Sequence, residues 1–337
     1  MKLIRSLAVA GLFILSHAQA TVVSEKFAAD PALNGWQIFG DTNLFHWNSA
    51  DHNLAVTWDS SRPNSYYYHP LGATVNRSND FMLAFDLHLD DITIGTDPGR
   101  PSTFQLAIGL INFTEATNEE FIIGTGYQAP DLVEFDYFPA FADALNSYSA
   151  SVTTPMISSE NNFANVGFTV PLELTPGTLY HAVMVYTAEN QTLHTTLSSN
   201  GVPVGPVQDT TLYDGFGDFS VDTLSINSYS DAGQDLTVYT NSDGSTVIYA
   251  GSLLAHGEVH RLLFASPLPV TSIVAGTPGV VGFTGTTNWL YTLERSTNFQ
   301  SWTEASLPAA GVAGAMTLTD TNPPDESACY RVRASLP

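Results

Sequence analysis

Alternation of apolar and polar residues with a period of two runs through much of this chain, and it limits what the chain can fold into. In residues 81–89 every odd position is phenylalanine or leucine, whereas the even positions include Asp86 and His88. Residues 104–110 repeat the pattern, and residues 179–187 follow it less regularly. Successive side chains of a β-strand point to opposite faces of a sheet, so this period predicts strands with one face in a core.

Short strands separated by turns are expected along the whole chain. Turn sequences such as Pro176-Gly177 and Asn200-Gly201 lie between the apolar runs. Only residues 113–121 and 139–146 look able to form a short helix. Many short strands at this spacing predict an all-β fold, either a sandwich or a barrel. The other strands predicted before residue 266 cover residues 54–58, 65–69, 165–170, 219–226, 236–239 and 259–264.

The first 20 residues have the composition of a secretory signal peptide. Lys2 and Arg5 precede an apolar run over residues 7–15, and Ala18-Gln-Ala20 forms a small-x-small cleavage site. We therefore expect cleavage after Ala20 and a mature protein that is secreted, periplasmic or held at the cell surface.

The chain is acidic, with 10 lysines and arginines against 33 aspartates and glutamates. The expected signal peptide holds two cations and no acid, so its removal changes the net charge from −23 to −25. Such a surface repels nucleic acid and anionic lipid head groups, so neither is an expected partner. No apolar run after Ala20 reaches the ~20 residues of a membrane span. The sequence does not indicate how many copies of the chain assemble.

A change of composition near Ser266-Pro-Leu-Pro269 predicts a boundary between two domains. Residues 21–266 form the larger predicted domain, and residues 267–337 are poorer in acids and predict a small β-sandwich. The single cysteine, Cys329, excludes an intramolecular disulfide and reads as a structural thiol on a strand. The strands expected in the small domain cover residues 270–275, 280–284, 290–294, 315–319 and 329–334.

Several stretches of the large domain carry a resemblance to a known superfamily. They are residues 53–59 (NLAVTWD), 65–69 (SYYYH), 81–87 (FMLAFDL), 132–139 (LVEFDYFP), 219–226 and 255–259. Together they resemble the concanavalin A-like lectin and glucanase superfamily, in its secreted bacterial members. The resemblance implies a jelly roll of two antiparallel sheets, one of them curved, with the first and last strands side by side.

The last part of the chain carries a second resemblance. Residues 291–298 (YTLERSTN), 301–303, 318–324 and 330–332 are similar to the small, fibronectin type III-like β-sandwich that ends many exported proteins of Verrucomicrobia-like bacteria. The resemblance implies an accessory terminal domain and no particular activity.

An acidic pair in the predicted strand 132–139 is the first candidate site. On a strand, Glu134 and Asp136 point to the same face, about 7 Å apart along the backbone. Their neighbours Val133, Phe135 and Tyr137 point the other way, toward the expected core. We therefore expect the two carboxylates on a hollow outer face of the sheet, where a ligand can reach them.

The superfamily resemblance implies catalytic roles for such a pair only if a third acid follows. The glucanase motif is E-x-D-x-E or E-x-D-x-x-E, with the last glutamate as acid/base, but this chain has Phe138 and Pro139 at those positions. A glycosidase needs two carboxyl groups flanking the sugar bond, so Glu134 and Asp136 are catalytic candidates without a proton donor. The alternatives are a polar pair facing solvent, or a pair that helps hold Ca²⁺ or a sugar hydroxyl.

A group of aromatic residues is the second candidate site. Sugar rings have apolar C–H faces that stack on aromatic rings while polar neighbours bind the hydroxyls. Trp58, Tyr66 and Tyr68 are therefore candidate ligand-binding residues, with Tyr66 and Tyr68 on one face of their strand and Tyr67 on the other. Core packing is the alternative for each ring.

No cofactor is expected, although the acidic composition leaves carboxylates for a divalent cation such as Ca²⁺. The acidic turns at Asp90-Asp91, at Asp231 and Asp235, and at Asp243-Gly244 are weak candidates for it.

The sequence thus favours a secreted protein that binds a polysaccharide or cell-surface glycan without catalysis. The alternatives are a degenerate or unusual polysaccharide-cleaving enzyme and a purely structural surface protein.

Overall fold

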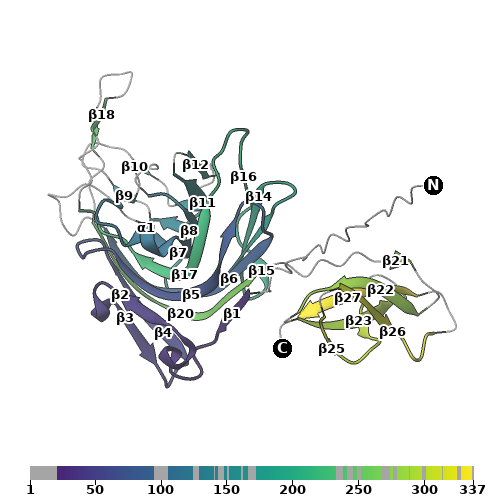
Figure 1. Ribbon diagram of the computed structural model, residues 1–337. Helices are drawn as coiled ribbons and strands as arrows, with labels where there is room; N and C mark the ends of the chain where they lie inside the picture. The colour runs from purple at the N-terminus through teal and green to yellow at the C-terminus, as the bar shows by residue number, and fades with distance from the viewer. Residues whose placement is uncertain are drawn as a thin grey trace, which may run out of the picture. The chain divides into compact units, whose positions relative to one another are not determined.

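Two stacked antiparallel sheets make up most of residues 21–266 in the computed structural model (Figure 1). The chain divides into two units, Thr21–Val270 and Thr271–Pro337. The boundary predicted near residue 267 falls at the start of residues 267–273, which lie outside the described part. The structure describes residues 21–94, 105–123, 129–139, 141–142, 148–149, 152–160, 162–165, 172–232, 238–240, 246–248, 252–266, 274–275, 279–287, 289–297, 301–312, 314–324 and 328–335.

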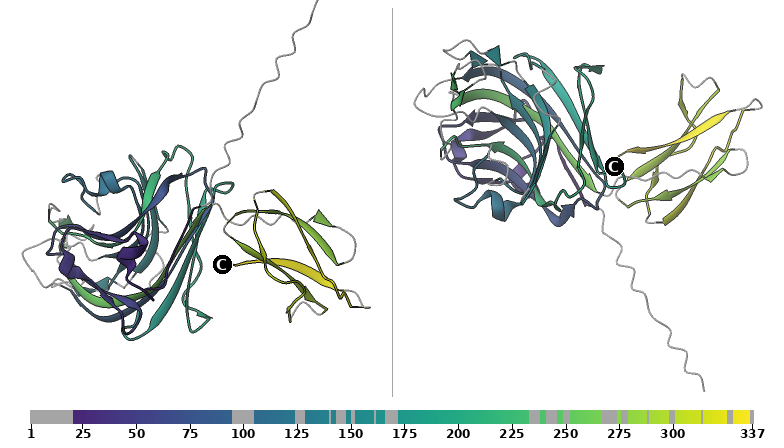
Figure 2. Two further views of the ribbon diagram at one scale, coloured as in Figure 1. Left: turned by 60° about the horizontal axis from the view of Figure 1, so that its bottom comes forward. Right: turned by 90° about the horizontal axis from the view of Figure 1, so that it is seen from above.

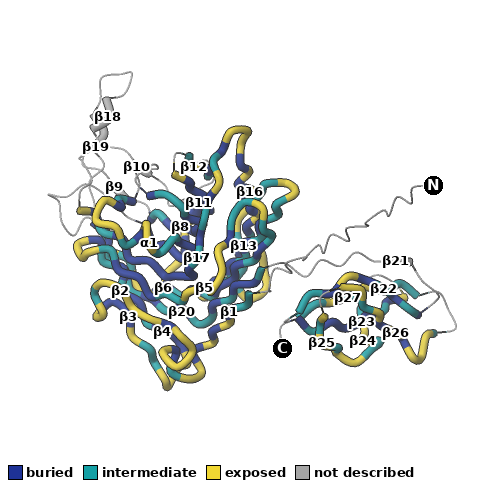
Figure 3. The backbone as a smooth tube through the Cα atoms, viewed as in Figure 1, coloured by how far each residue is buried: buried dark blue, intermediate teal, exposed yellow. Residues whose placement is uncertain are grey.

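The first sheet has nine strands, in the order β15-β14-β13-β6-β20-β4-β3, with β1 paired to β20 and β16 paired to β14. Buried and less buried residues alternate along β4, β6 and β13 (Figure 3), as the period of two predicts. Its strands are β1 (Thr21–Glu25), β3 (Phe45–Asn48), β4 (Asn53–Asp59), β6 (Phe81–Ile94), β13 (Leu179–Thr187), β14 (Thr192–Ser199), β15 (Val202–Pro203), β16 (Gln208–Thr211) and β20 (Leu253–Ser266).

The second sheet has seven strands, in the order β12-β11-β8-β7-β17-β5-β2. The two sheets curve together, and α1 (Phe113–Ala116) lies on the concave side of the seven-stranded sheet (Figures 1 and 2). Its strands are β2 (Gln37–Phe39), β5 (Ser65–Asn76), β7 (Leu106–Ile111), β8 (Leu132–Phe138), β11 (Val152–Ser159), β12 (Asn162–Asn165) and β17 (Ser220–Ser228).

The first and last strands of this unit lie side by side, as a jelly roll requires. β1 pairs antiparallel with the end of β20, from Thr21 opposite Ser266 to Glu25 opposite Leu262. The predicted all-β class and the jelly-roll sandwich are therefore confirmed.

The main core lies between the two sheets. The odd residues of β6, from Phe81 to Leu89, are at most 2% exposed and meet Val133, Phe135 and Tyr137 of the opposite sheet. Phe85 packs edge to face against Phe135, with ring centroids 5.3 Å apart. The sequence therefore assigned the correct face of β8 to the core.

A second apolar layer covers the concave face of the seven-stranded sheet. Ala116 at the end of α1, together with Phe121, Ile123 and Ala129, packs on that face in a cluster that also contains Tyr66 and Tyr229. The short helix begins at Phe113, where the Asn112 side chain accepts a hydrogen bond from the Glu115 N–H and so caps it. This layer is the feature that decides which candidate residues meet solvent.

The shorter elements complete the larger unit. The helix expected over residues 139–146 is not confirmed, because Phe141–Ala142 is a strand and residues 140 and 143–147 lie outside the described part. The remaining elements are η1 (Pro31–Asn34), η2 (Thr42–Leu44), β9 (Phe141–Ala142), β10 (Tyr148–Ser149), β18 (Val238–Thr240) and β19 (Thr246–Ile248).

The C-terminal unit is a small sandwich of two sheets, one with the order β21-β22-β26 and one in which β24, β25 and β27 all pair with β23. Its core includes Tyr291 and Phe283, whose ring centroids are 4.9 Å apart. Cys329, a free and half-buried thiol, begins β27. The strands are β21 (Val274–Ala275), β22 (Val280–Gly285), β23 (Leu290–Ser296), β24 (Thr303–Glu304), β25 (Ala309–Ala310), β26 (Gly314–Thr319) and β27 (Cys329–Ser335).

Candidate functional site

Four of the five predicted site residues lie on the concave face of the seven-stranded sheet. Strand register places Asp136 in a row with Ala107, Asn227 and Tyr66 across β8, β7, β17 and β5. The neighbouring row contains Glu134, Gly109, Ser225 and Tyr68, in the same order of strands. The period of two correctly placed Glu134 and Asp136 on one face of their strand, and Tyr66 and Tyr68 on one face of theirs. The strand register puts both pairs on the same face of the sheet.

The acidic pair is buried, which corrects the expectation that a ligand can reach it. Glu134 and Asp136 are both 0% exposed, because the layer containing α1 and Phe121 covers this part of the concave face. The two carboxylates do lie on the face opposite the main core, but that face is a second interior.

Neutral donors surround the buried pair. The Tyr229 hydroxyl donates to Glu134 Oε1 over 2.5 Å, and the Asn227 side-chain N–H donates to the same oxygen. The Gln105 side-chain N–H donates to Asp136 Oδ1 over 2.8 Å. Glu134 Oε2 and Asp136 Oδ2 have no hydrogen-bond partner among the described residues. Each carboxyl group thus keeps one oxygen that a proton can occupy.

Burial changes the acidity of this cluster. It raises the pKa of Glu134 to about 7, against the hydrogen bonds from Tyr229 and Asn227, which lower it. Burial, and then the charge of Glu134, raise the pKa of Asp136 well above its usual value. Two carboxylates in one dry volume repel each other, so the pair holds at least one proton near neutral pH.

The described residues supply few charged ligands for a cation at this pair. Ca²⁺ is held by six to eight oxygens, often from several carboxylates, and Glu134 and Asp136 contribute two carboxylates. Within the described ranges, no three or more histidine, cysteine, aspartate or glutamate side chains form a group that could hold a metal. The unpartnered oxygens suit a hard cation, but the charged donor set is incomplete.

The acidic turns considered for Ca²⁺ have other partners or lie outside the described part. Asp235 and Asp243 belong to the undescribed residues. The others contact neighbouring side chains. Asp90 Oδ1 lies 3.2 Å from His88 Nδ1, and Asp91 Oδ1 lies 2.8 Å from His256 Nδ1. Asp231 accepts a hydrogen bond from the Ser60 hydroxyl over 2.9 Å.

Two of the three candidate aromatic contacts are interior residues, as the core-packing alternative has it. Trp58, on β4 of the nine-stranded sheet, is 1% exposed and belongs to the main core. Tyr66 is 0% exposed, and its hydroxyl donates to the Ala116 carbonyl over 2.7 Å. Tyr66 thereby fastens the covering layer to the sheet.

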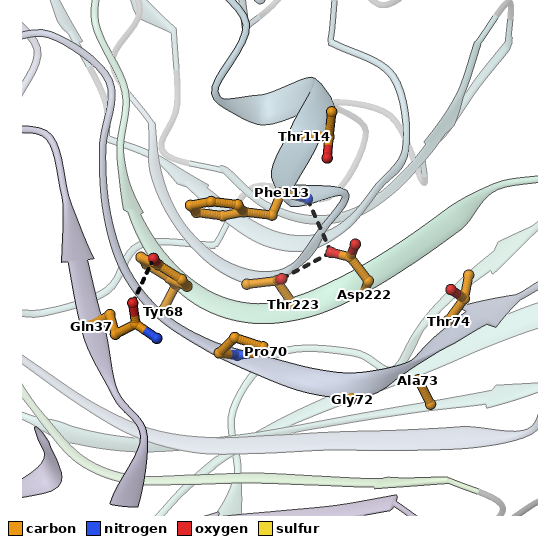
Figure 4. Close-up of a pocket in the computed structure, with 10 residues that line it drawn as sticks. All are labelled: Gln37, Tyr68, Pro70, Gly72, Ala73, Thr74, Phe113, Thr114, Asp222 and Thr223. Atoms are coloured by element: carbon orange, nitrogen blue, oxygen red, sulfur yellow. Dashed lines mark hydrogen bonds between the residues drawn. The ribbon is translucent and has the colours of Figure 1, made fainter. Parts of the chain in front are cut away.

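Tyr68 is the predicted residue that lines an open pocket. Its ring stacks on Phe113 with centroids 4.3 Å apart, and its hydroxyl donates to Gln37 Oε1 over 3.1 Å. The pocket has a volume of about 440 Å³ and lies between β2, β5, β17 and the start of α1 (Figure 4). Its lining consists of Gln37, Tyr68, Pro70, Gly72, Ala73, Thr74, Phe113, Thr114, Asp222 and Thr223.

An irregular stretch of β5 forms one wall of the pocket. Thr223 of β17 pairs with Pro70, but Val221 pairs with Val75, so Asp222 alone stands opposite residues 71–74. Such a bulge bends a strand and re-aims the side chains beside it. Gly72 makes this turn with a left-handed φ of +70°, which glycine adopts without steric cost.

Asp222 has one oxygen fixed and one oxygen free. Asp222 Oδ1 accepts hydrogen bonds from the Phe113 N–H over 3.0 Å and from the Thr223 hydroxyl over 2.8 Å. No hydrogen bond from a described residue reaches Oδ2. Figure 4 shows Tyr68 and Gln37 at one end of the pocket, Thr74 at the other, and Asp222 with Thr223 between them.

Sequence reasoning missed most of this pocket. Asp222 lies within a predicted strand, where it reads as an ordinary solvent-facing residue. The one local signal was Gly72, since a glycine inside a strand pattern often marks a bulge. Phe113 and Gln37 come from segments distant in sequence, and no short pattern joins them to Tyr68.

Comparison with known proteins adds the following. No protein-family model matches the chain, and no curated protein matches it. The solved structures that it resembles include lectins. Peanut lectin is 12% identical, with 75% of this chain and 100% of that chain covered and a TM-score of 0.45. A Lotus tetragonolobus seed lectin is 13% identical, with 73% and 97% covered and a TM-score of 0.42.

The chain also resembles arcelin-5, described as a lectin-like defense protein from Phaseolus vulgaris. It is 13% identical, with 74% of this chain and 99% of that chain covered and a TM-score of 0.36. At such identities and TM-scores the likeness carries no argument about function. The sheet order and register given above carry the fold on their own.

Within the described ranges, no helix is long and apolar enough to cross a membrane.

Proposed function

We propose that this protein is a non-catalytic glycan-binding protein and that the pocket beside α1 holds the sugar. The proposal depends on the stacked rings of Tyr68 and Phe113, which line the same pocket as Asp222. Asp222 Oδ1 is hydrogen-bonded within the protein, and its Oδ2 is left for a ligand. Aromatic rings bind the C–H face of a pyranose, while a carboxylate and neighbouring hydroxyl groups accept and donate to its hydroxyls. Thr74, Thr114 and Gln37 supply further polar groups at the same pocket.

The acids argue against the polysaccharide-cleaving alternative. Glycoside hydrolysis uses two carboxyl groups on either side of the bond, whereas Asp222 is the only carboxylate among the described residues that line this pocket. Glu134 and Asp136 are buried beneath the layer that contains α1, away from any ligand in the pocket. We therefore propose that the acidic pair has a structural role.

We further propose that the protein is secreted, on the strength of Lys2, Arg5 and the apolar run that follows them. Thr21 is the first residue of β1, so cleavage after Ala20 leaves that strand whole. N-terminal sequencing of protein recovered outside the cytoplasm tests this proposal, and a mature chain that begins at Thr21 is the expected result.

A glycan array probed with the full mature chain, followed by calorimetric titration of the strongest hit, tests the binding function. We expect Tyr68→Ala to weaken binding at least about tenfold, since stacking and the hydrogen bond to Gln37 are both lost. Phe163→Ala is the matched control, because Phe163 is an exposed aromatic residue of the same sheet but lies on β12, at the edge far from β5.

Three outcomes contradict the proposal in different ways. Binding that survives Tyr68→Ala removes the pocket from the site. The absence of binding to any glycan favours a purely structural protein. Release of reducing sugar that disappears in Glu134→Gln restores the enzyme alternative.

A further inference from the structure

The charges around the pocket restrict which glycans it can accept. Among the described residues that line the pocket, Asp222 is the only one with a carboxyl group, and none of them is a lysine, arginine or histidine. A uronate or sulfate group placed here would therefore meet a carboxylate with no cation in the lining to balance it.

The geometry of Asp222 keeps that carboxylate in place. Its Oδ1 is held by the backbone N–H of Phe113 and by the Thr223 hydroxyl, so the carboxylate cannot turn away without breaking two hydrogen bonds. Its Oδ2 is left to accept from a ligand. An oxygen that only accepts selects a donor, such as a sugar hydroxyl or a protonated amine, and repels a second anion.

More negative charge lies beside the pocket. Burial first, and then the charges of Glu115, Asp218 and Glu160, raise the pKa of Asp131 to about 6. Asp131 Oδ1 accepts from the N–H of Ser220, two residues before Asp222, and Glu115 follows the lining residue Thr114, so these two acids lie beside the pocket.

Arg77, which follows the end of the pocket-lining strand β5, is turned to other partners. The Arg77 backbone N–H donates to Asp218 Oδ1, but its guanidinium group donates to Gln191 Oε1 and to the Phe216 carbonyl. The guanidinium therefore has fixed acceptors away from the pocket lining.

From these observations, and resting on the proposed glycan-binding function, we propose that the pocket binds neutral or amino sugars and rejects uronate and sulfated sugars, with Asp222 as the residue that sets this selectivity. Asp222 accepts one or two hydroxyl or ammonium protons through Oδ2, and the Tyr68–Phe113 pair covers the C–H face of the same ring.

The test compares neutral oligosaccharides with the same oligosaccharides after oxidation of their primary hydroxyl groups to carboxylates. Ring stereochemistry and linkage stay the same, so the added charge is the main change. We expect the wild-type chain to bind the oxidised form about tenfold more weakly or worse. Two like charges about 4 Å apart repel by ~1 kcal/mol in water and by about 4 kcal/mol at the dielectric near a protein surface, and a tenfold loss of affinity corresponds to ~1.4 kcal/mol.

In Asp222→Asn we expect this discrimination to fall within about threefold, because the charge is gone. Asparagine keeps an oxygen that accepts from Phe113 and Thr223, so the fold is retained, which circular dichroism checks. Asp209→Asn is the matched control, since it removes the same charge from an exposed residue of β16 in the other sheet. It should leave the discrimination unchanged.

Each remaining outcome overturns a defined part of the argument. Equal or tighter binding of the oxidised form by the wild-type chain overturns the selectivity. Discrimination that persists in Asp222→Asn overturns the role of that residue while the selectivity stands. If the wild-type chain binds no member of either set, the proposed function itself fails, and the inference fails with it.

Discussion

Gly109 lies directly opposite Glu134 in the paired strands β7 and β8, and the Glu134 side chain crosses over it. A Cβ atom at Gly109 would stand 2.7 Å from Glu134 Cγ and 2.3 Å from the Val133 carbonyl oxygen. The missing side chain opens the path by which Glu134 reaches Asn227 and Tyr229 beyond β7.

Gly109→Ala should therefore destabilise the protein by about 1–3 kcal/mol, because the methyl group overpacks against backbone and a buried side chain. Urea denaturation followed by tryptophan fluorescence measures the change. Gly282→Ala, in a strand where the nearest atom to the new Cβ is 4.0 Å away, is the control and should change stability little. Equal effects of the two substitutions would contradict the packing of Glu134 over Gly109.

The acidic pair predicts a stability that falls as the pH rises. The pKa of Glu134 in the folded state is about 7, above the value of an unfolded chain, so between about pH 4.5 and pH 7 the folded state binds more protons. The free energy of unfolding should then decrease with pH in this window, by up to about 1.4 kcal/mol per pH unit and per group. Asp136, whose pKa is also raised, adds to the decrease.

Glu134→Gln isolates this effect from the general charge of an acidic protein. Glutamine keeps the carbonyl oxygen but does not titrate, so we expect the variant to be less sensitive to pH and more stable than wild type at pH 8. A Ca²⁺ ion at the pair would produce the opposite pattern. Stability that rises from pH 5 to pH 8, together with a melting temperature that EDTA lowers in wild type but not in Glu134→Gln, would contradict neutralisation by protons.

Tyr66 and Tyr68 should respond differently to substitution although they are two residues apart. Tyr66→Phe removes the hydrogen bond to the Ala116 carbonyl and leaves a buried acceptor, so it should cost about 1 kcal/mol of stability. Its glycan affinity should equal that of wild type, since the ring is interior. A loss of affinity in Tyr66→Phe without loss of stability would return Tyr66 to the binding site.

The bulge at Gly72 should be needed for binding. An added Cβ meets no atom within 4 Å, but the left-handed φ of +70° costs an L-residue about 1–2 kcal/mol. We expect Gly72→Ala to lower stability by about this amount and to weaken glycan binding, because the strain is relieved by moving residues 71–74. Gly201→Ala has the same open surroundings and a φ of +74°, but Gly201 lies in the turn between β14 and β15 of the other sheet. It should cost similar stability with no loss of affinity.

The sequence was most informative where one strand determines the answer. The alternation in residues 132–138 separates Val133, Phe135 and Tyr137 from Glu134 and Asp136, and the structure agrees with that division. Alternation also located β6 and β13, because each has one apolar face. It missed β2 and β12, whose few residues lie at sheet edges and show no regular apolar face.

The alternation could not predict whether the candidate site is exposed to solvent. Asn227 and Tyr229 lie more than 90 positions from Glu134, and α1 covers the sheet from a third part of the chain. A strand pattern assigns a residue to a face, but it does not say what packs on that face. The pocket depends likewise on four separate segments and on a register shift opposite Asp222.

The pairing of β1 with β20 has a consequence for how the chain is made. Residues 21–25 find their strand partners only at residues 262–266, so the larger unit cannot close until nearly all of it has left the ribosome. Contacts this distant in sequence slow folding, and until they form, the edge of β20 that β1 covers is open to other strands. A chain shortened before residue 262 should therefore aggregate instead of forming a smaller folded domain.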